Sequence, residues 1–213
     1  TIATTGNSTD FGNLTVSRMG GIGTASNNSR LVMVSGNNAG GESGLNTMDY
    51  VTVGSTGNAT DFGDLVVACR YKGGVSDGTR GVYGAGYGAG ADPGMIVSID
   101  YQDVATTGNC SDFGDFSGSG HMSGQNWSNG TRSIHGGIDQ NTTTIEYLTI
   151  QSTGNGTDFG DLTHADYATA SGGDLTRTVN ASGDTGNEID YVTTATTGNA
   201  TDFGNLTVGR SVT

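Results

Sequence analysis

The chain has 213 residues, a formal net charge of −13, 39 glycines, one proline and 7% aromatic residues. This composition excludes one large core of bulky side chains and favours small apolar contacts spread along the chain. The acidic charge excludes a surface that follows phosphates, so nucleic acid is not an expected partner, and no apolar run is long enough for membrane insertion.

Secondary-structure signals favour strands throughout. No long stretch has helical periodicity, whereas β-branched residues and Asn-Gly or Asp-Gly pairs are common. We therefore expect an all-β fold. Cys69 and Cys110 stand at non-equivalent places without metal-ligand spacing, which excludes a disulfide scaffold and a zinc site and leaves their redox state open.

The motif Thr-Gly-Asn-x-[Ser/Thr]-Asp-Phe-Gly occurs five times at intervals of 51, 51, 46 and 44 residues. Its phenylalanines are Phe11, Phe62, Phe113, Phe159 and Phe203. This period suits propeller blades and divides one repeat domain, 1–213, into a partial unit at about 1–17 and full units at 18–69, 70–120, 121–165 and 166–213. Because Thr1 falls within an expected strand, we expect the chain to be a piece of a longer or processed polypeptide.

After each motif, an apolar-polar alternation such as residues 14–17 predicts a half-buried strand. A turn such as Asp77-Gly78 or Asn129-Gly130 then leads to an arginine that opens a short strand. These arginines are Arg30, Arg80, Arg132 and Arg177. We expect them to form inter-unit ion pairs or to donate to backbone carbonyls, with a carboxylate ligand as the alternative.

Nearly all length variation falls between the arginine and the next strand, where the distance to the following tyrosine is 20, 21, 15 or 14 residues. Such a loop in a repeat fold lies on one common face, which is often the binding face. The predicted binding residues are Asn37, Asn38, Glu42, Tyr87, Asp92, Asp139, Asn141 and Asp184.

A [Met/Ile]-[Asp/Glu]-Tyr strand follows, and its tyrosine always precedes the next motif phenylalanine by 12 residues. This constant spacing predicts a rigid hairpin. We expect the phenylalanine to pack between units, the preceding aspartate to stabilise a turn, and the following glycine to adopt positive φ. The glycines are Gly12, Gly63, Gly114, Gly160 and Gly204.

Paired carboxylates in three motifs give calcium as an alternative to the hairpin turn. The pairs are Asp61 with Asp64, Asp112 with Asp115, and Asp158 with Asp161. In the first and fifth copies the second acid is Asn13 or Asn205, which favours the turn. No cofactor is expected, and calcium is the one that the pattern leaves open.

From Arg80-Gly-Val-Tyr-Gly-Ala-Gly through Ile99-Asp100-Tyr101 to Phe113, a unit resembles the Kelch repeat. A closer likeness is to the Kelch-like virion proteins of marine bacteriophages, especially cyanophages, on the string from Ile189 to Leu206. The resemblance implies Kelch-like β-propeller blades, four full and a partial fifth, closed or part of a larger propeller. An open β-repeat array is the alternative. The departures are a phenylalanine in place of the usual tryptophan and a glycine doublet missing from some units.

The resemblance implies a structural or tail-fibre protein of a virion, located in the virion or extracellularly and not an enzyme. Its variable loops would bind a host cell-surface glycan or protein, or would assemble with copies of itself or other virion proteins. The alternative is a cellular adhesin or filament subunit. A glycan hydrolase on a propeller is a third hypothesis, for which the unique acids are Glu42, Asp92, Asp139 and Asp184.

Overall fold

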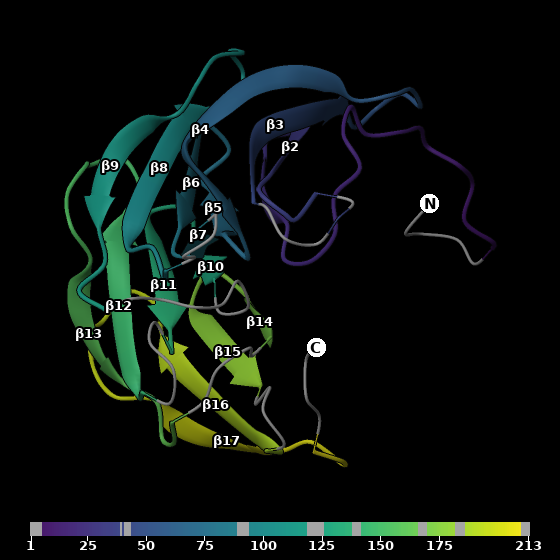
Figure 1. Ribbon diagram of the computed structural model, residues 1–213. Coiled ribbons are helices and arrows are strands. Elements are labelled where there is room, and N and C mark those ends of the chain that lie inside the picture. The colour runs from purple at the N-terminus through teal and green to yellow at the C-terminus, as the bar shows by residue number, and fades with distance from the viewer. Residues whose placement is uncertain are drawn as a thin grey trace.

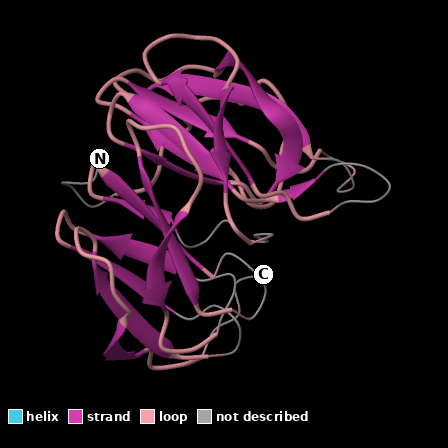
Figure 2. Cartoon of the chain, turned by 90° about the vertical axis from the view of Figure 1, so that its left-hand side faces the viewer, coloured by secondary structure: helices cyan, strands magenta, loops and turns pink. Residues whose placement is uncertain are grey.

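A computed structural model describes residues 6–38, 40, 44–88, 94–118, 126–137, 142–165, 170–181 and 186–209. Figure 2 shows strands joined by loops and no helix in these residues. The predicted all-β class is confirmed. Among the described residues, no helix could cross a membrane.

The described strands form four antiparallel sheets, one to each repeat interval. The first contains β1 (Gly23–Ser26), β2 (Arg30–Val34), β3 (Leu45–Thr52) and β4 (Thr60–Arg70), with the short β7 (Tyr87–Gly88) at the β4 edge. The second contains β5 (Gly73–Ser76), β6 (Arg80–Gly84), β8 (Ser98–Asp103) and β9 (Ser111–Asp115). The third contains β10 (Asn126–Ser128), β11 (Arg132–Gly136), β12 (Thr144–Thr149) and β13 (Thr157–Asp161). The fourth contains β14 (Ala170–Gly173), β15 (Arg177–Ala181), β16 (Glu188–Thr193) and β17 (Thr201–Asn205).

The sheets follow one another along an arc (Figure 1). Their first strands lie on the inside, where β1 contacts β5, β5 contacts β10 and β10 contacts β14. Among the described strands, the fourth sheet does not pack on the first as neighbouring sheets pack on each other, and Figure 1 shows the two ends of the arc apart. The arc is therefore open in this structure.

The turn between the first two strands is the same in every sheet. An Asn or Asp Oδ1 atom accepts the backbone N–H groups two and three residues later, which is how Asx residues stabilise turns. Gly78 has φ 90° and Gly130 has φ 85°. The turns predicted at Asp77-Gly78 and Asn129-Gly130 are confirmed.

The motif phenylalanines of the first three sheets pack between sheets. Phe62, Phe113 and Phe159 are 2 to 3% exposed, and Phe62 shares a cluster with Tyr83 and Val104 of the second sheet. The packing prediction is confirmed for these three copies. It is wrong for Phe11 and Phe203, which are 39% and 56% exposed because a complete sheet does not cover either ring.

Each phenylalanine of β4, β9, β13 and β17 also meets the tyrosine of the neighbouring strand edge to face, with ring centroids 5.8 to 6.1 Å apart. The repeated arginine lies over the ring of that tyrosine, 4.4 to 4.6 Å from the ring centroid. In the first three sheets the same guanidinium donates to a backbone carbonyl of the next sheet, namely Ala105, Ile150 or Ala195. The predicted inter-unit role of the arginines is confirmed in its carbonyl form.

Adjacent units are joined by a repeated set of backbone contacts that we call the latch. At the junction of the first two sheets, Gly108 N donates to Phe62 O at 2.7 Å and Cys110 N donates to Asp64 O at 2.8 Å. Asp64 N donates in turn to Asn109 Oδ1 at 3.0 Å. Equivalent contacts occur at the other junctions, starting with the one between the Phe11 segment and the first sheet.

The latch explains the glycine after each phenylalanine. All five have φ between 140° and 147°, which confirms the predicted positive φ. A Cβ atom on Gly63 would lie 2.4 Å from Gly108 O, so a side chain at this position would push the incoming turn away. The preceding aspartate has its predicted turn role in the first and fifth copies, where Asp10 and Asp202 accept the N–H of that glycine.

Candidate binding site

Three of the predicted loop residues lie in described parts of the chain: Asn37, Asn38 and Tyr87. Asn37 is 6% exposed and exchanges backbone hydrogen bonds with Met19, while Asn38 Oδ1 accepts the N–H of Gly40. These two asparagines thus organise the loop. The other predicted residues, Glu42, Asp92, Asp139, Asn141 and Asp184, lie outside the described residues.

Arg70 brings two predicted residues together. Its Nη1 atom lies 3.4 Å from Asn37 Oδ1, and its guanidinium stacks 4.7 Å from the ring centroid of Tyr87. The ring of Tyr71 lies on it at 5.8 Å. Arg70 was not predicted as a site residue, because it stands outside the arginine register of the repeat. The cluster fastens the loops of the first two units to each other.

The six aspartates predicted for calcium lie on β4, β9 and β13, and five of them are exposed. Asp161 Oδ1 accepts a hydrogen bond from Thr143 Oγ1 at 2.8 Å. Within the described residues, no three His, Cys, Asp or Glu side chains gather in a way that could hold a metal ion. Calcium binding at the motif stays a prediction.

Four acidic side chains are buried between the sheets: Asp49, Asp100, Glu146 and Asp190. Each belongs to the [Met/Ile]-[Asp/Glu]-Tyr strand. Its constant position before the tyrosine was visible in the sequence, but no role was predicted for it. Three of these acids accept hydrogen bonds from the residue that stands four positions after the preceding motif phenylalanine. These are Thr15 on Asp49, Ser117 N on Glu146 at 3.2 Å, and Thr163 on Asp190 through N at 3.1 Å and Oγ1 at 2.6 Å.

A basic side chain accompanies three of the buried acids. Arg18 Nη2 lies 2.5 Å from Asp49 Oδ2, Lys72 Nζ lies 3.1 Å from Asp100 Oδ2, and His164 Nδ1 lies 3.6 Å from Asp190 Oδ2. Burial raises the pKa of Asp100, and the nearby Lys72 opposes this rise. Burial also raises the pKa of the Cys69 thiol to about 11, so this cysteine is a protonated packing residue rather than a nucleophile at neutral pH.

A groove runs along the inside of the arc, over β1, β5 and β10. It encloses about 270 Å³ and is lined by Thr24, Ala25, Ser26, Gly74, Val75, Ser76, Asn126, Trp127 and Ser128. Alternation along β1 buries Gly23 and Ala25 and leaves Thr24 and Ser26 exposed, so hydroxyl groups face the groove. The site thus combines an aromatic ring with a row of small polar groups.

Neighbouring sheets hold Trp127 and Asn126 in place. The indole Nε1 donates to Asp174 O of the fourth sheet at 3.1 Å. Asn126 Oδ1 lies 2.6 Å from Nδ1 of His135, a ring whose pKa burial lowers to about 3, so His135 is neutral. Gly73 makes room for Asn126, since a Cβ atom there would collide with the amide. The groove residues were not predicted, because the first strands lie outside the variable loops.

No protein-family model matches the sequence, and no curated protein matches it. Among solved structures, the chain is similar to a novel fungal alcohol oxidase of the AA5 family in complex with copper, with a TM-score of 0.67 and 11% sequence identity. The match covers 89% of this chain and 43% of the oxidase, so the chain spans less than half of that protein. At this identity the likeness concerns the fold alone. Since no group of three metal-ligating side chains forms among the described residues, they do not fit a copper site.

Proposed function

We propose that the chain is a non-catalytic scaffold of Kelch-like propeller blades in a virion or tail fibre, and that its inner groove binds a host-surface glycan. The four antiparallel sheets support this proposal, because each has its first strand inside the arc and its fourth strand outside, as a blade would (Figure 1). The resemblance of the repeat to Kelch-like virion proteins supports this role. A cellular adhesin built from the same units is the alternative.

The observation that carries the proposal is the groove itself. An indole ring offers an apolar face to the C–H groups of a sugar ring, and the neighbouring hydroxyl and amide groups suit sugar hydroxyls. Three different sheets contribute Thr24, Ser76 and Trp127, so the surface exists only in the assembled array. The formal charge of −13 repels acidic polysaccharides, which favours neutral or amino sugars as ligands.

Trp127 is the only tryptophan of the chain, so its fluorescence reports directly on the groove. Maltohexaose and chitosan hexamer serve as neutral and cationic probes, and dextran sulfate serves as an acidic one. We expect a saturable fluorescence change with a neutral or cationic oligosaccharide and none with dextran sulfate. Isothermal titration of Trp127→Ala should show at least tenfold weaker binding, while Tyr87→Ala in the loop cluster keeps the wild-type affinity.

Two results would count against the groove. The first is that Tyr87→Ala weakens binding and Trp127→Ala leaves it unchanged, which would move the site to the variable loops. The second is that neither probe class binds at millimolar concentration. Location is tested separately by mass spectrometry of purified phage particles, since absence from the particles would favour the cellular adhesin.

A further inference from the structure

The outer face of the fourth sheet exposes residues that the other sheets bury. Phe203 is 56% exposed, and Leu206, three residues later, is half-buried. In the first sheet, the corresponding Phe62 and Leu65 are 2% and 3% exposed, because the second sheet packs on them. The fourth sheet thus presents one half of the packing surface that joins consecutive units.

The backbone of this face has the same conformation as the backbone that forms the latch in the other units. Gly204 has φ 140°, Asp202 Oδ1 accepts its N–H at 2.9 Å, and the ring of Phe203 meets Tyr191 as in the other sheets. At the four earlier glycines, a Cβ atom would lie 2.2 to 2.5 Å from the backbone of the incoming Thr-Gly-Asn turn. At Gly204 a Cβ atom would meet no atom of the described residues within 4 Å. The place of that turn is open.

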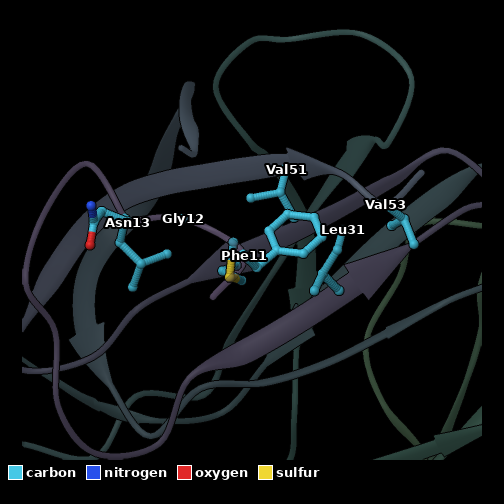
Figure 3. A pocket seen from close by; sticks show the side chains of 8 residues that line it. Phe11, Gly12, Asn13, Leu31, Val51 and Val53 are labelled. Atoms are coloured by element: carbon cyan, nitrogen blue, oxygen red, sulfur yellow. The ribbon is translucent and has the colours of Figure 1, made fainter. Parts of the chain in front are cut away.

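The first sheet presents the other half at the opposite end of the arc. Figure 3 shows an apolar hollow there, about 280 Å³ in volume, over β2 and β3. Its sheet residues are Leu31, Met33, Val51 and Val53. Phe11 and Leu14 lie over them, and Gly57 N donates to Phe11 O at 2.8 Å. This latch leaves Phe11 39% exposed, because no described strand backs its segment.

The two ends match in sequence as well as in shape. Residues 9–16 and 201–208 both read Thr-Asp-Phe-Gly-Asn-Leu-Thr-Val. The fourth sheet therefore carries the same eight residues that the first sheet already binds. The segment 9–16 belongs to no strand, whereas 201–208 begins on β17, which is paired with β16.

We propose that a second copy of this chain covers the open face, with the fourth sheet of one copy packed on the first sheet of the next. Residues 201–208 replace residues 9–16 of the second copy on β2 and β3, and its turn at residues 56–58 occupies the place beside Gly204. Arg18 remains on Asp49, so that buried carboxylate keeps its cation. The contact joins two different surfaces, so it is head-to-tail and produces closed rings or filaments. This assembly goes beyond the proposed function and does not depend on glycan binding.

Sedimentation velocity of the whole chain over a concentration series tests the proposal. The wild type should form species larger than the 21.5 kDa monomer in a concentration-dependent manner. Phe203→Asp should weaken association at least tenfold. Leu175→Asp is the matched control, because Leu175 is 77% exposed in the β14–β15 turn, whereas Phe203 lies on β17; it should associate like the wild type.

A variant with the opposite expected effect makes the test specific. Phe11→Ser with Leu14→Ser weakens the segment that competes for the first sheet, so it should strengthen association about tenfold, with circular dichroism confirming the fold. A mass of one chain at every concentration for the wild type and this variant would overturn the proposal. Equal losses of association for Phe203→Asp and Leu175→Asp would also overturn it. So would a monomeric wild type combined with a lower melting temperature of Phe203→Asp, because that pair of results indicates closure within one chain.

Discussion

Two glycine-to-alanine substitutions separate the energy of the latch from the strain of its backbone. Gly114 and Gly204 have φ 145° and 140°, so alanine suffers similar strain at both sites, about 1–2 kcal/mol for a non-glycine residue at such angles. Only at Gly114 would the new Cβ atom collide, 2.4 Å from Gly154 O. Gly204 is the internal control.

The collision at Gly114 acts on three hydrogen bonds. Gly154 N donates to Phe113 O at 2.7 Å, Gly156 N to Asp115 O at 2.8 Å, and Asp115 N to Asn155 Oδ1 at 3.1 Å. At about 1 kcal/mol for each bond, their loss adds about 3 kcal/mol to the strain. We expect Gly204→Ala to lower the free energy of unfolding by about 1–2 kcal/mol and Gly114→Ala to lower it by about 4–5 kcal/mol.

Urea unfolding of dilute monomer, followed by circular dichroism and by Trp127 fluorescence, measures both changes. Amide hydrogen exchange at Gly154 localises the effect, because its N–H should exchange faster in Gly114→Ala and not in Gly204→Ala. Losses that agree within about 1 kcal/mol would refute the reasoning, since the strain alone would then account for both variants.

Three further predictions concern two buried side chains, His135 and Lys72, and the repeated arginines. Burial lowers the pKa of His135 to about 3 from its ordinary 6.5, so the unfolded chain binds the proton first and the free energy of unfolding should fall as the pH drops from about 6.5 toward 3. Urea titrations at each pH should show a flatter pH dependence for His135→Gln. An unchanged pH dependence would contradict this prediction. Lys72→Met leaves Asp100 buried without its cation, so it should lower the free energy of unfolding in urea by about 3–5 kcal/mol. Adding Asp100→Leu should restore most of this loss. A Lys72→Met variant as stable as the wild type would contradict the pairing. In thermal unfolding, Arg132→Ala should lower the free energy of unfolding by about 1 kcal/mol more than Arg177→Ala, because Arg132 also donates to Ala195 O of the next unit. Equal losses would show that this hydrogen bond contributes nothing.

Periodicity made the repeating parts predictable. Constant spacing between tyrosine and phenylalanine indicated the hairpin, and glycine after phenylalanine indicated positive φ, because both properties are local to the chain. The packing of Phe62 was also predictable, because a large ring that recurs once in each unit suits the contact between neighbouring units. The exposure of Phe203 did not, since it depends on which sheet follows in space, and a repeated motif reads the same at an end as in the middle.

The candidate site was less predictable because it is made by tertiary contacts. Trp127 occurs once and has no counterpart in the other units, so no period marks it, and its groove exists only where the first strands of three sheets meet. The buried acids had a visible pattern, but their partners differ: Arg18, Lys72 and His164 stand at different distances from the motif. We expected the binding residues in the variable loops. In the first of these loops, Asn37 is buried and holds the loop together.

The latch has a consequence for how such a chain can change its length. Both halves of the contact, the Thr-Gly-Asn turn and the Phe-Gly backbone, are encoded within one short stretch of the gene. Unequal crossing-over between two copies of that stretch deletes or duplicates a whole unit in frame and leaves every new neighbour with a complete backbone contact. The basic residues facing Asp49, Asp100 and Asp190 are encoded outside it, so the descendants that survive such an event are those in which the buried acids still meet a basic partner.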